Sequence, residues 1–260
     1  MDFYDELCQA IAADGAKRGV RTSPEVFQKF LHSIQVERSN QTVQSSRIPE
    51  RSIPEIMPPQ PENSIQEPEN IPVDMPLPDD WDSLRSIVLS CRKCPLACTR
   101  QNVVFGEGNL RPRLIFIGEG PGAEEDATGR PFVGAAGQLL DKMIAAMHLA
   151  REDVYIANIV KCRPPDNRMP SVEEAAACIG YLKKQIELLQ PEVIVLLGGT
   201  ALSFLLELNG ITKYRGRWQD YNNIPVMPTF HPAFLLRKAE AKREAWHDLK
   251  LVMAKLGISV

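Results

Sequence analysis

The feature that most constrains the fold of this 260-residue chain is an apolar run that stops at a cluster of glycines. Leu114–Ile117 is followed by Gly-Glu-Gly-Pro-Gly at 118–122, and an amphipathic run begins at Ala135. The apolar run indicates a buried strand, the glycines permit a tight loop, and the amphipathic spacing indicates a helix. Open α/β sheets bind ligands at the carboxyl ends of their strands, so we expect this loop to border the functional site.

The glycine loop does not match the common nucleotide-binding patterns. It lacks the Gly-Lys-Ser/Thr ending of a phosphate-binding loop, and its glycines are spaced G-x-G-x-G rather than G-x-G-x-x-G. Pro121 removes one backbone donor, and the acids Glu124, Glu125 and Asp126 repel phosphate. From the loop alone, a tight strand-to-helix turn with a solvated acidic rim stays open beside a ligand site.

Strands and helices alternate along the chain from Trp81 onward. We predict strands at Leu114–Ile117, Val154–Ile159, Val193–Leu197 and Pro225–Met227. We predict helices at Asp82–Ser90, Ala135–Met147, Ser171–Leu189, Thr200–Leu208 and Lys238–Leu256. Ser171 and Glu174 form a capping box at the start of one of them. This alternation predicts an α/β fold with a parallel sheet that is covered by helices on both faces.

The chain divides into three parts by composition. Residues 1–38 have the apolar spacing of short helices, and 39–80 form a flexible linker in which nine of the chain's 21 prolines lie between Pro49 and Pro78. Residues 1–80 hold 7 Lys and Arg against 14 Asp and Glu, whereas 81–260 hold 23 against 19. The domain at 81–260 is therefore mildly basic, which is compatible with DNA binding. Residues 1–80 either act as a plain tether or bind a protein partner.

The cellular location is predicted from two patterns. No apolar segment approaches the roughly 20 residues that span a bilayer, and the acidic N-terminus MDFYDELC lacks the basic and apolar regions of a signal peptide. We therefore expect a cytoplasmic protein that contacts no membrane, and we expect it to be a monomer. In that compartment its six cysteines are reduced or metal-bound rather than paired in disulfides.

Four cysteines have the spacing of a metal site. Cys91 and Cys94 are separated by two residues, and Cys162 and Cys178 lie far downstream. A close pair with two distant thiolates suits an iron–sulfur cluster or zinc, and unrelated buried thiols are the third interpretation. Cys98 is a further candidate ligand, because it lies close in sequence to Cys91 and Cys94.

Two polar side chains follow other predicted strands. Asn158 lies among apolar residues, and its amide either pairs with the edge of a pyrimidine base or ties down a loop. His231 either donates a hydrogen bond to charge that develops in a transition state or packs as a structural residue. The nearby Leu235 and Leu236 either wedge into a duplex or form the first core turn of the last helix.

Together these motifs resemble the family 4 uracil-DNA glycosylases, the iron–sulfur members of the uracil-DNA glycosylase superfamily. The resemblance rests on GEGPG at 118–122, GRPFVG-x-AGQLL from Gly129, N-x-x-K-C-R-P-P from Asn158, HPA from His231 and the cysteine spacing. It covers about Ser90–Leu256. It implies a three-layer α/β/α sandwich with a short, mainly parallel four-stranded sheet, and a [4Fe-4S] cluster bound by Cys91, Cys94, Cys162 and Cys178.

The resemblance also implies roles for the site residues. Uracil is flipped out of DNA, Phe132 stacks on the base, and Asn158 forms hydrogen bonds with its polar edge. The backbone of Gly118, Glu119 and Gly120 lines the uracil pocket, and His231 stabilises the negative charge that leaves with the base. Glu119 and Glu125 are the candidates for polarising water or balancing the oxocarbenium-like sugar.

Two departures from other branches of the superfamily refine this reading. Gly120 stands where other branches place an Asp that orients water, so leaving-group stabilisation and base strain are expected to carry more of the barrier. No basic insertion with a histidine lies between Arg130 and Gln138, which argues against the branch that traps DNA covalently. We predict a monofunctional uracil-DNA glycosylase that leaves an abasic site. The alternatives are a glycosylase for other deaminated bases and a non-catalytic iron–sulfur DNA-binding module.

Overall fold

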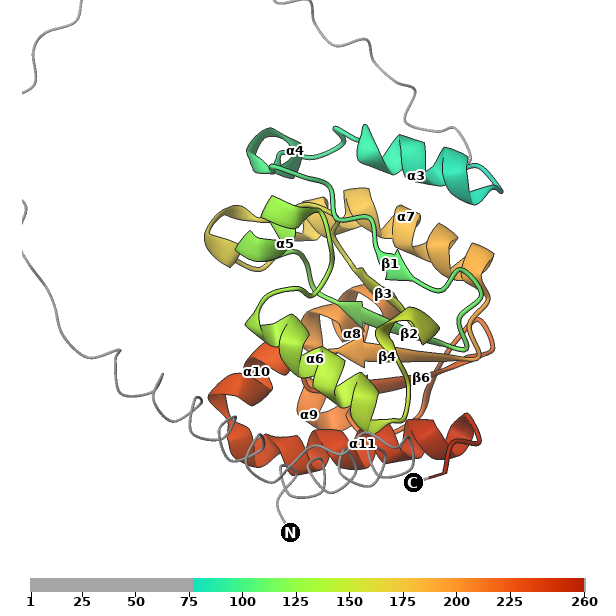
Figure 1. Cartoon of the computed structure of the whole chain (residues 1–260). Coiled ribbons are helices and arrows are strands. Elements are labelled where there is room, and N and C mark those ends of the chain that lie inside the picture. The colour runs from blue at the N-terminus through green and yellow to red at the C-terminus, as the bar shows by residue number, and fades with distance from the viewer. Residues whose placement is uncertain (1–76, 260) are drawn as a thin grey trace, which may run out of the picture. The chain divides into compact units, whose positions relative to one another are not determined.

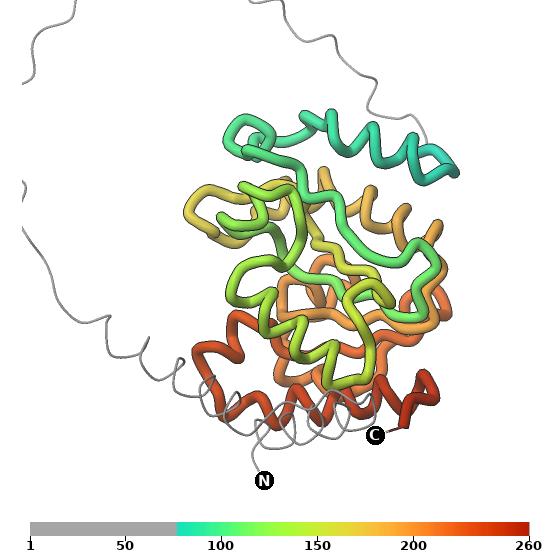
Figure 2. The backbone as a smooth tube through the Cα atoms, in the orientation of Figure 1, coloured from blue at the N-terminus to red at the C-terminus, as the bar shows by residue number. Residues whose placement is uncertain are grey.

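The computed structural model describes residues 77–259. Figure 1 shows the elements of this part of the chain, and Figure 2 follows its backbone in the same orientation. The helices predicted within 1–38 and nearly all of the linker predicted at 39–80 lie outside the described residues. The division of the chain at residue 81 therefore stays a prediction.

The centre of the fold is a set of four adjacent parallel strands formed by the predicted apolar runs. They are β2 (Leu114–Gly118), β3 (Tyr155–Asn158), β4 (Val193–Leu197) and β6 (Ile224–Thr229). β2 pairs with β3 on one side and β4 on the other, and β4 pairs with β6. Every residue of β2, β3 and β4 is buried, as expected for parallel strands covered on both faces. The four predicted strands and their parallel pairing are confirmed.

The sheet is nevertheless mixed and has six strands, so the prediction of four was wrong. β1 (Glu107–Gly108) pairs antiparallel with β3, and β5 (Gln219–Tyr221) pairs antiparallel with β6, giving the order β1-β3-β2-β4-β6-β5. These edge strands have two and three residues and no buried residue, so they leave no apolar pattern. Asn222 and Asn223, both at positive φ, form the tight turn between β5 and β6. Such a pair of asparagines is a hairpin signal.

The helices of the described residues fall close to the predicted ranges. The longer ones are α3 (Trp81–Leu89), α6 (Ala135–Ala146), α7 (Val172–Leu189), α8 (Gly199–Leu206) and α11 (Lys242–Lys255). The shorter ones are α4 (Leu96–Thr99), α5 (Ala123–Thr128), α9 (Ile211–Tyr214) and α10 (Pro232–Arg237), with 3-10 turns at Arg151–Asp153, Pro165–Asn167 and Ala239–Ala241. The last predicted helix begins at Lys242 rather than at Lys238, because a 3-10 turn occupies Ala239–Ala241. Helix α10 was not among the predicted helices. None of these helices is long and apolar enough to cross a membrane.

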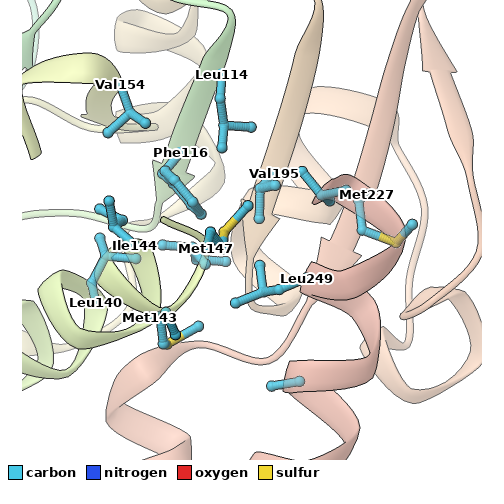
Figure 3. Close-up of a cluster of buried hydrophobic side chains, with 14 of the residues drawn as sticks. Leu114, Phe116, Leu140, Met143, Ile144, Met147, Val154, Val195, Met227 and Leu249 are labelled. Carbon is cyan, nitrogen blue, oxygen red and sulfur yellow. The ribbon is translucent and has the colours of Figure 1, made fainter. Parts of the chain in front are cut away.

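Alternate side chains of the central strands pack against helices on opposite faces of the sheet. Leu114 and Phe116 of β2 belong to one buried cluster with side chains of α6 and α11, part of which is shown in Figure 3. Ile115 and Ile117 belong to a second cluster with side chains of α3, α7 and α8. Figure 1 shows α6 and α11 on one side of the sheet and α3 and α7 on the other. Helices therefore cover both faces.

Candidate active site

The parallel pairing brings the predicted site segments to one edge of the sheet. Gly118 at the end of β2 is paired with Asn158 at the end of β3. Leu197 at the end of β4 is paired with Thr229 at the end of β6, two residues before His231. Because all four carboxyl ends meet at this edge, the loops that leave them surround a common space.

Gly118 lies where two candidate side chains meet. A Cβ atom added at this position would lie 2.5 Å from Asn158 Oδ1 and 2.5 Å from Phe132 Cζ. Only glycine fits between these two groups without a shift of one of them. The backbone of β2 therefore contacts both the amide and the aromatic ring that were predicted to bind the base.

Phe132 is held in an uncommon backbone conformation with a φ of 50°. Arg151 Nη1 donates a hydrogen bond to Phe132 O at 3.2 Å, and Arg151 also bonds to the preceding carbonyl of Pro131 and to Asp141. Gly137 of α6 leaves room for this loop, since a Cβ there would lie 2.0 Å from Phe132 O. Strained residues persist when their surroundings hold them, and Arg151 and Gly137 do so here. The sequence reasoning did not identify Arg151.

Asn158 carries a buried polar atom without a partner. The residue is 1% exposed, and its Oδ1 is the single buried side-chain oxygen or nitrogen of residues 77–259 that has no hydrogen-bond partner. A buried acceptor left in this state destabilises the fold by about 1–3 kcal/mol. A ligand that donates a hydrogen bond to this atom would remove that destabilisation.

His231 is oriented by the start of α10. Its Nδ1 accepts a hydrogen bond from Ala233 N at 3.1 Å, so the neutral imidazole carries its proton on Nε2. Its ring centroid lies 5.7 Å from that of Phe132. The residue keeps part of its surface exposed, yet protein atoms crowd its ring. The pKa of His231 is lowered to about 4, chiefly by this desolvation and also by the charge of Arg237, while Glu125 opposes both effects. The side chain is therefore a neutral donor at physiological pH.

The two predicted carboxylates have different partners. Glu119 Oε2 accepts a hydrogen bond from Thr200 Oγ1 at 2.5 Å, and Thr200 lies in the first turn of α8, which follows β4. Glu125 Oε1 accepts hydrogen bonds from the backbone N–H groups of Val133 and Gly134, each at 2.9 Å, and its Oε2 accepts one from Gly122 at 3.1 Å. Glu125 thus ties the glycine loop to the loop that carries Phe132. The sequence reasoning missed Thr200, although its position after a strand was a signal.

Gly120 and the leucines of α10 complete the expected set. A Cβ at Gly120 would lie 2.7 Å from Val160 Cγ2, so a larger side chain there would require the Val160 side chain to move. Leu235 is fully buried and Leu236 is 48% exposed. Leu235 is therefore a core residue, as the second alternative for this pair predicted. Leu236 remains exposed and could contact a partner.

The four predicted cysteine ligands line one recess. Cys91, Cys94, Cys162 and Cys178 border one narrow recess, whereas Cys98 is exposed on α4 and does not line it. Cys91 and Cys94 lie between α3 and α4, and Cys178 lies on α7. The recess thus joins segments that are far apart in sequence.

The chemistry of the recess suits a bound metal centre. Burial raises the pKa of Cys178 to about 12 and also raises the pKa values of Cys94 and Cys162. Thiolates in such a setting need cationic partners. Arg100 Nη1 donates to Cys162 Sγ at 3.1 Å, and Lys161 N donates to Cys178 Sγ at 3.4 Å. Within 77–259 no three His, Cys, Asp or Glu side chains are arranged to hold one metal ion.

A second recess of about 900 Å³ lies away from these residues. Side chains of α7 and of the β5–β6 hairpin line it together with Leu77 and Asp79. None of the candidate uracil-binding residues or cysteine ligands borders it. Its size therefore does not make it the candidate active site, because the predicted chemical groups converge elsewhere.

Comparison with known proteins agrees with the motifs. The family model of the uracil DNA glycosylase superfamily matches residues 105–250. A type-4 uracil-DNA glycosylase of Thermotoga maritima is 53% identical over 168 residues, which cover 63% of this chain and 88% of that protein. The type-4 enzymes of Archaeoglobus fulgidus and Saccharolobus solfataricus are 42% identical over 183 and 188 residues, covering 67% and 68% of this chain and 92% and 87% of theirs. The chain belongs to the uracil-DNA glycosylase superfamily, and within it to the type-4 group.

Proposed function

We propose that this protein is a monofunctional uracil-DNA glycosylase that hydrolyses the N-glycosidic bond of deoxyuridine in DNA and leaves an abasic site for base excision repair. Its family membership and its type-4 relatives support this assignment. The single structural observation that carries it is the unpartnered Oδ1 of Asn158, which lies beside Phe132 at the glycine loop. The buried amide supplies both an acceptor and a donor for a base edge.

Asn158 selects uracil by the direction of its hydrogen bonds. Uracil presents an N3–H donor beside the O4 acceptor, and an amide can meet both with its Oδ1 and Nδ2. Cytosine presents the reverse pattern at these two positions, so it would face Oδ1 with an acceptor. Phe132 stacks on the flipped base, and the backbone of Gly118–Gly120 closes the pocket beside it. The duplex base must leave the helix to reach these groups.

His231 promotes departure of the base. When the bond between C1′ and N1 breaks, its electron pair remains on uracil, and the negative charge spreads to the uracil oxygens. The Nε2–H of neutral His231 donates a hydrogen bond to this charge, as a preorganised donor in an oxyanion hole does. A water hydroxyl adds to C1′, and the remaining proton passes to uracil. Glu119 and Glu125 place negative charge near the oxocarbenium-like sugar. Gly120 adds no carboxylate that would orient water, so departure of the base dominates the barrier.

DNA binding is assigned to the mildly basic domain and to the exposed leucine of α10. Leu236 is followed by Arg237 and Lys238, so an apolar tip is flanked by two positive charges. An exposed apolar side chain of this kind can enter a base stack while the cations bind phosphates. His231 begins the same helix, which places the tip close to the reaction. A protein partner of residues 1–80 stays a prediction.

We further assign a [4Fe-4S] cluster to Cys91, Cys94, Cys162 and Cys178. The shared recess, the buried thiols and the hydrogen bonds to sulfur support this ligand set. The bound cluster would cross-link the segment before α4 to α7 and to the loop after β3. Metal analysis of the purified protein, together with its absorbance at about 400 nm, distinguishes an iron–sulfur cluster from bound zinc.

The function is tested with an oligonucleotide that carries one uracil and with a matched strand that carries thymine. Alkali cleaves abasic sites, so alkali-dependent cleavage of the uracil strand alone is the expected result. Cleavage without alkali would indicate a lyase step and contradict the monofunctional assignment. Binding without cleavage by iron-replete protein would favour the non-catalytic DNA-binding module. Release of other deaminated bases at similar rates would favour the broader glycosylase.

A further inference from the structure

Lys161 lies between the base-reading residue and the cysteine ligands, and the reaction as proposed does not use it. The side chain is 1% exposed. Its Nζ donates to Asn158 O at 3.1 Å and to Gln185 Oε1 at 2.6 Å. The next residue is the ligand Cys162, and the Lys161 backbone N–H donates to Cys178 Sγ. One residue thus contacts the strand end that reads the base and the wall of the cysteine recess.

The charge of Lys161 needs a partner that the surrounding carboxylates do not provide. Within residues 77–259, Lys161 forms no ion pair with an Asp or Glu. A buried ammonium with only neutral acceptors is strongly unfavourable, so buried charges are normally paired. Lys161 also lines the cysteine recess. Four thiolates around a bound [4Fe-4S] core of charge 2+ would have a net charge of about −2. That charge would supply the counterion that Lys161 lacks.

Gln185, whose side chain accepts a hydrogen bond from Lys161 Nζ, is itself held in one orientation. Gln185 of α7 is fully buried, and its Nε2 donates to Phe105 O at 3.0 Å and to Tyr155 Oη at 3.2 Å. These two bonds set which way the Gln185 amide points, so its Oε1 faces Nζ. The ammonium is therefore held between a rigid acceptor and the backbone carbonyl of Asn158. A change in the charge of the recess would act on the last residue of β3 through this contact.

We propose that Lys161 is a positioning residue that couples the negatively charged cysteine-bound cluster to the placement of Asn158, an inference that rests on the proposed function and cluster. In this arrangement the cluster holds the ammonium in place, and the ammonium holds the carbonyl of the residue whose side chain reads uracil. The cluster then contributes to base recognition without taking part in any chemical step. Residues that orient a metal centre from outside its ligand shell typically change metal affinity or activity about 10- to 100-fold when they are replaced.

The test compares iron-loaded wild type with Lys161→Met, Gln185→Met and Lys184→Met. Lys161→Met removes the charge with little change in shape. Gln185→Met removes one acceptor and keeps the charge. Lys184→Met is the matched control, because Lys184 is a partly buried lysine that pairs with Asp79 and Glu187 and does not line the cysteine recess. Three quantities are measured: the rate of iron loss to a ferrous chelator, the reduction potential of the cluster, and single-turnover uracil release.

For Lys161→Met we expect iron loss to be faster by roughly 10- to 100-fold and uracil release to be slower by a similar factor in protein that retains iron. The reduction potential should shift to a more negative value, because removal of a cation disfavours the reduced cluster. A purely structural lysine would not move the potential. Gln185→Met should leave the potential near that of wild type and slow uracil release, and Lys184→Met should leave all three quantities unchanged.

Unchanged potential and uracil release in Lys161→Met would overturn the proposal. A shifted potential with wild-type uracil release would overturn the coupling to Asn158. If Lys161→Met does not fold, Gln185→Met decides, and wild-type uracil release in that variant contradicts the proposal. Wild-type protein that holds iron but releases no uracil would instead refute the proposed function, while the potential still reports on the charge of Lys161.

Discussion

Asn158 and Lys161 lie three residues apart at the end of β3, and both are buried polar side chains with opposite hydrogen-bonding states. Asn158 Oδ1 has no partner among the described residues, whereas Lys161 Nζ donates to two acceptors. Asn158 belongs to the proposed base pocket, which is formed by Gly118, Phe132, Asn158 and His231. Lys161 belongs to the wall of the cysteine recess.

The proposed function explains this difference, because one surface would bind a base that is later released and the other would hold a cofactor permanently. A pocket that must accept and release uracil keeps an acceptor that only the substrate satisfies. A recess that holds a cofactor permanently has its remaining donors and acceptors paired within the protein. Replacement of the polar side chains of the base pocket should therefore change catalysis with little change in stability, whereas substitutions in the recess should change both.

The largest expected effect comes from His231→Ala, because it removes the donor for the charge on uracil. Loss of one such donor lowers the rate by roughly 100- to 1,000-fold. Single-turnover uracil release measures this change, and thermal unfolding checks that the fold is kept. His247→Ala, an exposed histidine on α11, is the control and should behave as wild type. Equal rates for His231→Ala and wild type would show that the base leaves without help from this residue.

Gly118→Ala should have the next largest effect. The new Cβ would lie 2.5 Å from both Asn158 Oδ1 and Phe132 Cζ, so at least one of the two must move. Displacement of a substrate-binding group by about 1 Å can lower the rate about 100-fold, and overpacking destabilises by about 1–3 kcal/mol. Gly199→Ala is the matched control, because no atom lies within 4 Å of its added Cβ. Wild-type uracil release by Gly118→Ala would mean that the two groups are not placed as described.

Cys178→Ser tests the other region. We expect this variant to lose the absorbance at about 400 nm, to unfold at a lower temperature, and to release uracil roughly 10- to 100-fold more slowly. Cys98→Ser changes an exposed cysteine outside the recess and should leave all three properties unchanged. A Cys178→Ser protein with full iron content would exclude this residue as a ligand. Loss of absorbance in Cys98→Ser instead would assign the fourth ligand to Cys98.

The smallest expected effect on catalysis is that of pH. Since the pKa of His231 lies at about 4, the residue stays neutral between pH 8 and 6. Single-turnover uracil release should therefore change by less than about twofold over this range. A histidine with an ordinary pKa of 6.5 would be mostly protonated at pH 6. A fall in rate with a midpoint near pH 6.5 that is lost in His231→Gln would contradict the neutral donor.

The same pKa shift makes the fold less stable in acid. Between pH 6.5 and 4 the unfolded chain binds a proton at His231 that the folded chain does not, so the free energy of unfolding decreases as the pH falls. The decrease due to this residue totals about 3 kcal/mol. Urea unfolding at several pH values measures it, and His231→Gln should lack this part of the decrease. If the free energy of unfolding falls equally with decreasing pH in the two proteins, the pKa of His231 in the folded chain must lie near its ordinary value.

The sequence predicted the parts of the fold that rest on long apolar runs. Leu114–Ile117 and Val193–Leu197 become central strands because both faces of a parallel sheet require apolar residues. β1 and β5 were missed because pairing with a neighbouring strand, rather than local pattern, defines them. Helix α10 (Pro232–Arg237) was not predicted, because six residues are too few to show a helical period, and the last helix was predicted to begin at Lys238 instead of Lys242.

Most of the candidate site was predictable from residues that follow a strand. Gly118, Asn158 and His231 were placed at one edge by that rule, and the structure brings them there. Thr200 also follows a strand and was overlooked. Arg151 and Gln185 were not predictable, because each acts by a contact between segments distant in sequence. No local spacing shows that Arg151 reaches the carbonyl of Phe132.

The most direct test of this account is uracil release from two oligonucleotides that differ only in having uracil or cytosine at one position, measured with wild type and with Asn158→Ala. If the unpartnered Oδ1 of Asn158 reads the base, wild type releases uracil and leaves cytosine in place. Asn158→Ala should then lose most of its activity on uracil and most of the difference between the two bases. A wild-type enzyme that releases both bases equally, or an Asn158→Ala variant that discriminates as wild type does, would contradict the account.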